Sequence, residues 1–146
     1  MAKKKSQIVD CPVLELVIPE RIVPKARPRF SKGRAFMPKN YRDNQQRLIE
    51  CIVPQFDDYV FNHDYGMYNV VIKRCSLEII HNGYARGDAD NISGSIMDAL
   101  VKGEVLTNDN VNCIYRLKFT HNDSKDSEGN PTTYCYLRRI VLESTL

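Results

Sequence analysis

Apolar and polar positions alternate along several stretches of the chain, and this pattern predicts most of its secondary structure. Four stretches rich in β-branched and aromatic residues are predicted to form strands: 13–23, 68–81, 111–121 and 132–143. Pro19 marks the first of these as an edge strand or a bulged one. The last two surround a polar turn, 122–131 (NDSKDSEGNP), so we expect them to pair as an antiparallel hairpin.

Two other stretches have apolar residues at helical spacing. Residues 40–53 are predicted to form a helix that ends or kinks at Pro54. Residues 91–102 are predicted to form a second helix, with Asn91 as its N-cap and Gly103 just past its end. Together the elements predict an α/β (α+β) fold: a single domain with a mixed sheet of about four strands packed with two main helices.

Length and composition agree with one globular domain. The chain has 146 residues, of which 42% are hydrophobic and 27% charged. We expect a basic N-terminal tail at residues 1–12 and the folded domain at 13–146. No apolar run approaches the roughly 20 residues of a membrane-spanning helix, so no membrane association and a cytoplasmic location are expected.

The cysteines and histidines do not suggest a site. The five cysteines are odd in number, widely spread and without a CxxC pair, so we expect reduced, mostly buried thiols rather than disulfides or a zinc site. His63, His81 and His121 are scattered and lack metal-ligand spacing. A structural or surface role is expected for them.

Positive charge is concentrated near the N-terminus. Residues 1–50 carry 12 Lys/Arg and 5 Asp/Glu, whereas residues 51–146 carry 9 and 13. Much of the excess lies in a basic loop, 24–39, with a short hairpin turning at Lys32-Gly33. The cations expected to bind phosphate are Lys25, Arg27, Arg29, Lys32, Arg34, Lys39 and Arg86. Phe30 and Phe36, interleaved with them, are expected to turn inward to the core. The alternative is that they stack on exposed bases or wedge into a DNA junction.

Carboxylates gather in the segment RGDADN, between a predicted strand and a predicted helix. Asp88 and Asp90 are two residues apart, so in an extended segment they point the same way. Asp109 follows the helix, and a strand–helix–strand connection is expected to return it close to this pair. Three carboxylates suit magnesium, which also keeps water and phosphate oxygens as ligands. The plainer interpretation is a pair of solvated loop aspartates.

Two neighbouring residues and one alternative metal bear on this site. Asn91 and Asp98 are candidates for supporting the metal ligands, although a structural hydrogen bond is the favoured role for Asp98. A calcium loop is excluded, because Ser93 and Ala99 stand where its glycine and glutamate belong.

The segments GDADN, IMDAL and VLTNDN, with VPKARPRF upstream, resemble the RusA family of Holliday junction resolvases over most of residues 13–143. The resemblance implies a metal-dependent endodeoxyribonuclease of phages and prophages that acts in DNA recombination and repair. It implies hydrolysis of four-way DNA junctions with Mg²⁺, for which Mn²⁺ can substitute, by a homodimer with two active sites. It also implies that Asp88, Asp90 and Asp109 are the metal ligands and catalytic residues.

One position departs from the family pattern. The family has a catalytic lysine four residues after the second aspartate, and this chain has Gly94 there. Lys25, Arg27 and Arg29 of the basic loop are candidates to replace its charge, whereas Lys102 lies two helical turns further on. The alternatives left open are a branched-DNA binding module with weak or no cleavage, and a nuclease for flaps, forks or RNA.

Overall fold

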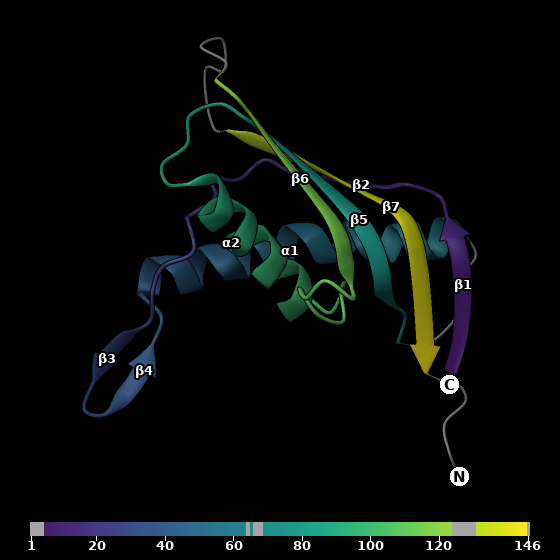
Figure 1. Cartoon of the computed structure of the whole chain (residues 1–146), viewed down its shortest axis with the longest axis horizontal. Coiled ribbons are helices and arrows are strands. Elements are labelled where there is room, and N and C mark those ends of the chain that lie inside the picture. The colour runs from purple at the N-terminus through teal and green to yellow at the C-terminus, as the bar shows by residue number, and fades with distance from the viewer. Residues whose placement is uncertain (1–4, 64, 66–68, 124–130, 146) are drawn as a thin grey trace.

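The computed structural model describes residues 5–63, 65, 69–123 and 131–145, and they form a mixed α+β fold as predicted. The elements are β1 (Lys5–Cys11), β2 (Leu14–Ile18), β3 (Arg29–Ser31), β4 (Arg34–Phe36), α1 (Lys39–Asn62), β5 (Val71–Asn82), α2 (Ala89–Lys102), β6 (Ile114–Asn122) and β7 (Thr132–Thr145). Figure 1 shows both helices on one face of the main sheet, and the β3–β4 hairpin projecting away from it.

β5 lies inside the main sheet, between β6 and β7. It pairs in parallel with β6 and antiparallel with β7, in the order β1-β7-β5-β6. The predicted antiparallel hairpin of residues 111–143 is therefore wrong. α2 carries the chain from the end of β5 back to the start of β6, and such a crossover produces parallel pairing. Most of the predicted polar turn, 122–131, lies outside the described residues.

β1 and β2 pair in succession with the other edge of β7. β2 pairs with the first half of β7, and β1 pairs with the second half. The ladder breaks between them, where Asp10 has a φ of 50°. β2 ends at Ile18 because Pro19 cannot donate to the ladder. Residues 5–11, expected in the basic tail, thus belong to the sheet, which has five strands rather than about four.

The core fills the space between the sheet and the two helices. α1 buries Tyr41, Leu48, Ile52, Phe56 and Tyr59, a stripe at helical spacing. The helix continues to Asn62 instead of ending near Pro54. Pro54 is exposed, so the carbonyl of the preceding turn that loses its N–H partner can bind water instead. The buried side chains that meet this stripe include Leu16, Ile18, Leu77, Ile79, Ile96, Leu100 and Leu137.

The cysteines behave as predicted. All five thiols are free, and all except the half-buried Cys51 are buried. Burial raises the pKa of the Cys75 and Cys135 thiols to about 12, so both stay protonated. Neither helix within the described residues combines the length and apolarity that crossing a bilayer requires.

Candidate active site

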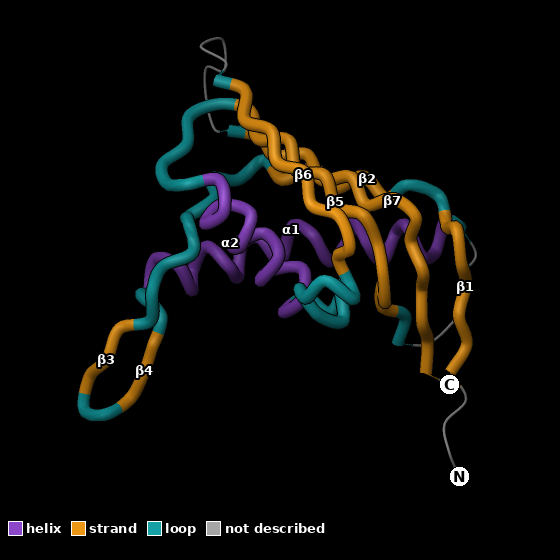
Figure 2. The backbone as a smooth tube through the Cα atoms, in the orientation of Figure 1, coloured by secondary structure: helices purple, strands orange, loops and turns teal. Residues whose placement is uncertain are grey.

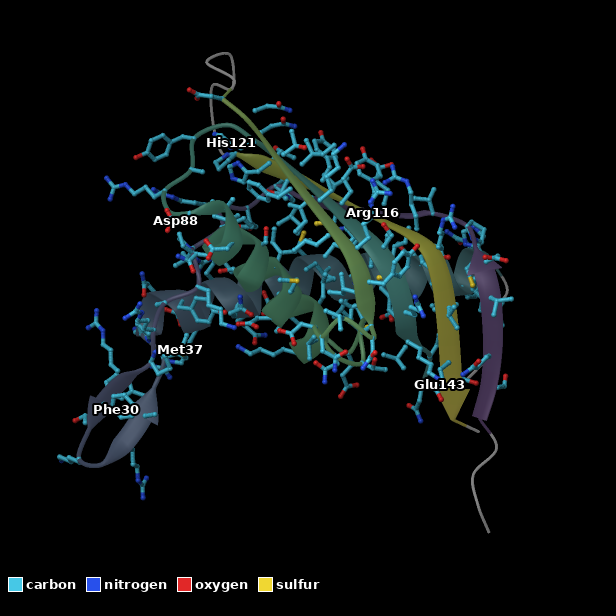
Figure 3. The ribbon with its side chains drawn as sticks, viewed as in Figure 1. Phe30, Met37, Asp88, Arg116, His121 and Glu143 are labelled. Atoms are coloured by element: carbon cyan, nitrogen blue, oxygen red, sulfur yellow. The ribbon has the colours of Figure 1, made fainter. Side chains whose placement is uncertain are left out.

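Two of the predicted acids lie at the start of α2. Asp88 is the N-cap, with φ −84° and ψ 154°, and its carbonyl oxygen accepts hydrogen bonds from the N–H groups of Asn91 and Ile92, both at 3.0 Å. Asp90 is in the first turn, where its Oδ1 accepts a hydrogen bond from the Asn91 N–H at 3.0 Å. The helix begins earlier than predicted, with Asp88 rather than Asn91 as its cap. Both carboxylates are exposed at the helix end that favours negative charge. Figure 3 labels Asp88 at this end of α2.

The loop that leads into Asp88 rests on the segment before the hairpin. Gly87 has a φ of 102°, in the left-handed region that favours glycine. A Cβ at this position would lie 2.5 Å from Cγ of Pro24, closer than two carbon atoms can approach. Glycine is therefore required here, because Pro24 packs directly against this position.

Residues 21–25, which we call the anchor segment, are clamped between the two helices. Asn44 of α1 accepts a hydrogen bond from the Val23 N–H at 2.9 Å and donates one to the Arg21 carbonyl at 2.6 Å. The Ser95 hydroxyl of α2 donates to the Val23 carbonyl at 2.5 Å. The Lys25 N–H donates to the Asn91 carbonyl at 2.9 Å. Four contacts thus hold this irregular segment against the start of α2.

Lys25 crosses α2 directly over Gly94. A Cβ on Gly94 would lie 3.2 Å from Cδ of Lys25 and 3.6 Å from its Cβ. The Lys25 ammonium then reaches Asp98, with Nζ 3.2 Å from Oδ1. The other oxygen of Asp98 accepts a hydrogen bond from the Tyr41 hydroxyl. Burial, helped by this bond, raises the pKa of Tyr41, so the phenol remains a donor.

These contacts assign a structural task to Asp98. Both of its carboxylate oxygens are engaged, and its side chain is only 17% exposed. The side chain of Lys25 is 46% exposed, so its ammonium faces solvent as well as Asp98. The aliphatic stem of Lys25 thus lies over Gly94, and its ammonium lies beside Asp98.

Asp109 lies at the opposite end of α2 from Asp88 and Asp90. Its loop runs beside the beginning of β5, where the Thr107 N–H donates to the Ile72 carbonyl at 3.1 Å. Asp88 instead follows the end of β5. Since α2 has 14 residues, its two ends are about 21 Å apart. The expectation that Asp109 returns close to the pair is thus wrong within one chain, because the crossover leaves the two loops at opposite edges of the sheet.

The described part of the chain accordingly contains no group of three acidic, histidine or cysteine side chains that could hold a metal ion. Asp88 and Asp90 still have suitable chemistry. They are exposed oxygen donors, and neither is paired with a cation among the described residues. Hard oxygen donors are what Mg²⁺ prefers. One chain thus has two of the predicted acids at one end of α2 and the third at the other.

The basic loop forms a projecting arm, residues 26–38, which contains β3 and β4. Lys32 and Gly33 at its tip have φ of 50° and 74°, as the predicted turn requires. The expectation that its aromatics turn inward is wrong: Phe30 is 78% and Phe36 44% exposed. The hairpin projects from the body, which leaves both rings exposed. Among the described residues, the predicted phosphate-binding cations are all exposed: Lys25, Arg27, Arg29, Lys32, Arg34, Lys39 and Arg86.

Arg86 lies on the loop before Asp88, apart from the arm. Its Nε donates to the Tyr84 hydroxyl at 3.0 Å, and this bond lowers the pKa of Tyr84. The pair adds a cation beside the two aspartates.

The sequence reading missed the polar residues that hold the anchor segment. Asn44 and Gln45 are buried on the apolar stripe of α1, and Gln45 donates from Nε2 to the Ser95 carbonyl at 2.8 Å. Amides at core positions of an amphipathic helix were the available signal, because buried polar groups need partners. Tyr41 gave no such signal, since a tyrosine on a buried stripe is ordinary.

Comparisons with known proteins bear on the identity of this site. A search of curated proteins found no match. One solved structure, a 2C-methyl-D-erythritol-2,4-cyclodiphosphate synthase, aligns with a TM-score of 0.35 at 10% identity, over 91% of this chain and 99% of that one; so weak a likeness carries no argument.

The family comparison is more informative. A sequence model of the family described as Endodeoxyribonuclease RusA matches residues 19–135, which include the anchor segment, the arm, α2 and all three predicted acids. Because this match covers most of the chain, the protein belongs to the RusA family of endodeoxyribonucleases, the Holliday junction endonucleases.

Proposed function

We propose that this protein hydrolyses phosphodiester bonds at four-way DNA junctions with Mg²⁺, for which Mn²⁺ can substitute, during recombination and repair. The observation that carries the proposal is the start of α2. There, two exposed carboxylates without a cationic partner in the described residues lie beside a clamped lysine and a basic arm, within the segment that matches the family. Such a combination suits a metal and a polyanion together.

Asp88, Asp90 and Asp109 are the proposed metal ligands. When bound, the metal would act as a Lewis acid and lower the pKa of the attacking water. Asp88 and Asp90 would hold the metal at the start of α2, and the loop that carries Arg86 would approach the phosphate. Asn91 supports the pair through its N–H bond to Asp90.

The separation of about 21 Å along α2 has a consequence for this ligand set. One ion cannot contact both ends of one helix, so we propose that Asp109 comes from a second copy of the chain. A homodimer arranged in this way has two equivalent sites, each with Asp88 and Asp90 from one protomer and Asp109 from its partner.

Lys25 is the proposed replacement for the missing lysine at position 94. Its backbone is fixed by Asn91, its stem lies over Gly94, and its ammonium is oriented by Asp98. Only one of its three N–H donors is needed for Asp98, which leaves donors for a phosphate oxygen. This arrangement favours an active nuclease over a binding module without cleavage.

The first experiment compares cleavage of a synthetic four-way junction by wild type, Asp90→Asn and Asp57→Asn. Asp57 is an exposed aspartate of α1 outside the proposed site and serves as the matched control. Wild type and the control are expected to cut with Mg²⁺ and to stop when EDTA is added, whereas Asp90→Asn should not cut. If wild type cuts no better than Asp90→Asn, the proposal is wrong. Parallel rates on forks, duplex and RNA separate a junction enzyme from a nuclease with other substrates.

A mixing experiment tests the shared site. Asp90→Asn and Asp109→Asn are each expected to be inactive. In a mixed dimer, one site carries both substitutions and the other carries none, so random mixing should restore about a quarter of wild-type activity. If all ligands come from one chain, the mixture stays inactive.

A further inference from the structure

The arm is a freestanding hairpin tied to α2 at both ends. Within the described residues, β3 and β4 pair only with each other (Figure 2). On the incoming side the chain is held to Asn91 through Lys25, and on the outgoing side Tyr41 is held to Asp98. Phe30 is five residues beyond Lys25, so it lies within about 18 Å of that anchor. A nucleic acid seated at the start of α2 is therefore within reach of the arm.

Phe30 is isolated on its own face of the hairpin. It pairs with Ala35 across the ladder, whereas Arg29, Ser31, Arg34 and Phe36 share the opposite face. A methyl group cannot cover a phenyl ring, and Phe30 makes no aromatic or cation–π contact with any described residue. Figure 3 shows it on the projecting arm, away from the core. Packing among the described residues therefore does not account for a phenylalanine here.

The charge around Phe30 identifies its partner. Residues 22–42 contain seven Lys/Arg and no Asp/Glu. Arg29 and Arg34 lie on the opposite face of the same two short strands, so one side of the hairpin suits phosphates while the other presents a ring. A polyanion that also offers flat apolar faces is a nucleic acid with accessible bases.

We infer that Phe30 stacks on a base opened at the branch point of the DNA, while Arg29 and Arg34 hold the adjacent backbone. The inference rests on the proposed function for the presence of branched DNA. Bases at a branch cost less to unstack than bases inside a duplex, so an exposed ring gains more at a branch than on an intact helix. Phe30 would thus contribute to the choice of branched over linear DNA, separately from the chemistry at the aspartates.

The test measures equilibrium binding to a four-way junction and to a duplex of equal length, in EDTA to prevent cleavage. Variants are Phe30→Ala, Phe30→Leu, Phe30→Trp and the control Phe61→Ala. Phe61 is 84% exposed in the last turn of α1, about 30 Å along that helix from Tyr41. A junction with 2-aminopurine at the branch reports stacking through its fluorescence.

Phe30→Ala is expected to weaken junction binding about 5- to 150-fold, the range for loss of one base–aromatic stack, with a much smaller effect on duplex. Phe30→Leu should behave like alanine, while Phe30→Trp should bind as wild type and still quench the probe. Equal binding by Phe30→Ala and Phe61→Ala, or an equal loss on junction and duplex, overturns the inference. If wild type binds the junction normally in those cases, the proposed function survives. Thermal melting should be the same for all variants, because Phe30 is 78% exposed and is not among the described residues that pack on the core. A lowered Tm for Phe30→Ala alone would also refute the inference.

Discussion

Removing the charge of Lys25 separates a catalytic role of this side chain from a structural one. Its ammonium pairs with Asp98 at 3.2 Å, and its side chain is 46% exposed. A salt bridge of that exposure contributes at most about 1 kcal/mol to stability. Lys25→Met keeps the aliphatic stem over Gly94, so it should lower the free energy of unfolding by less than that amount.

The effect of Lys25→Met on cleavage should be far larger. Loss of one group that stabilises charge in a transition state costs about 10²- to 10³-fold in rate. Single-turnover cleavage of a four-way junction with enzyme in excess measures this loss, and urea unfolding measures stability on the same sample. Lys25→Arg keeps a cation and should retain most of the rate. If Lys25→Met cuts at nearly the wild-type rate, the lysine is structural and the reasoning is refuted.

A swap of positions sharpens the same prediction. Lys25→Ala removes the Cδ that lies 3.2 Å from a Cβ at position 94 and leaves a Cβ at 3.6 Å, an ordinary contact. Combining Lys25→Ala with Gly94→Lys should therefore recover about tenfold or more of the rate lost by Lys25→Ala. A strong acceleration by Gly94→Lys in the otherwise native chain would show instead that the site lacks a cation and that Lys25 does not supply it.

Two further predictions concern stability. Gly87→Ala is expected to lower the free energy of unfolding by about 2–4 kcal/mol, because it combines a φ of 102° with a methyl group 2.5 Å from Pro24. Urea unfolding should be compared with that of Gly33→Ala, where φ is 74° but nothing lies within 4 Å. The difference between the two losses of stability measures the clash with Pro24, and equal losses would contradict this prediction. Desolvation, followed by repulsion from His121, lowers the pKa of His81 below its usual 6.5. The unfolded chain then binds the proton more readily, so stability should hold above about pH 6.5 and decline as the pH falls through the lower folded value. Thermal melting across this range should show the decline, and His121→Ala should reduce it; a pH-independent Tm would count against the assignment.

Local patterns predicted much of the fold and placed two of the candidate acids beside α2. The stripe on α1, the strand residues and the cap region of α2 all follow from the spacing of apolar residues and from side-chain chemistry over a few positions. Asp88 and Asp90 were named as candidates from their spacing, but the extended backbone expected for them was wrong, because Asp88 is the N-cap and Asp90 lies in the first turn of α2. The turn at Lys32-Gly33 was also predicted, because few residue pairs adopt positive φ twice in succession.

Long-range pairing was not predictable in this way. The polar segment after β6 resembled a hairpin turn, but β5 lies between β6 and β7, because α2 brings the chain back parallel to β5. The same crossover separates Asp109 from Asp88. A pattern over consecutive residues carries no information on which edge of a sheet a later strand will join.

The sequence by itself determined the helices, most of the strands, the acidic pair at the start of α2 and the positive charge of the arm, because each depends on neighbours in the chain. Only the tertiary structure decided that Lys25 lies over Gly94, that Asp109 is at the far end of α2, and that Phe30 is uncovered. Each of these three depends on contacts between segments far apart in sequence, or on their absence. Burial and pairing are properties of the packed whole, so a pattern over consecutive residues does not contain them.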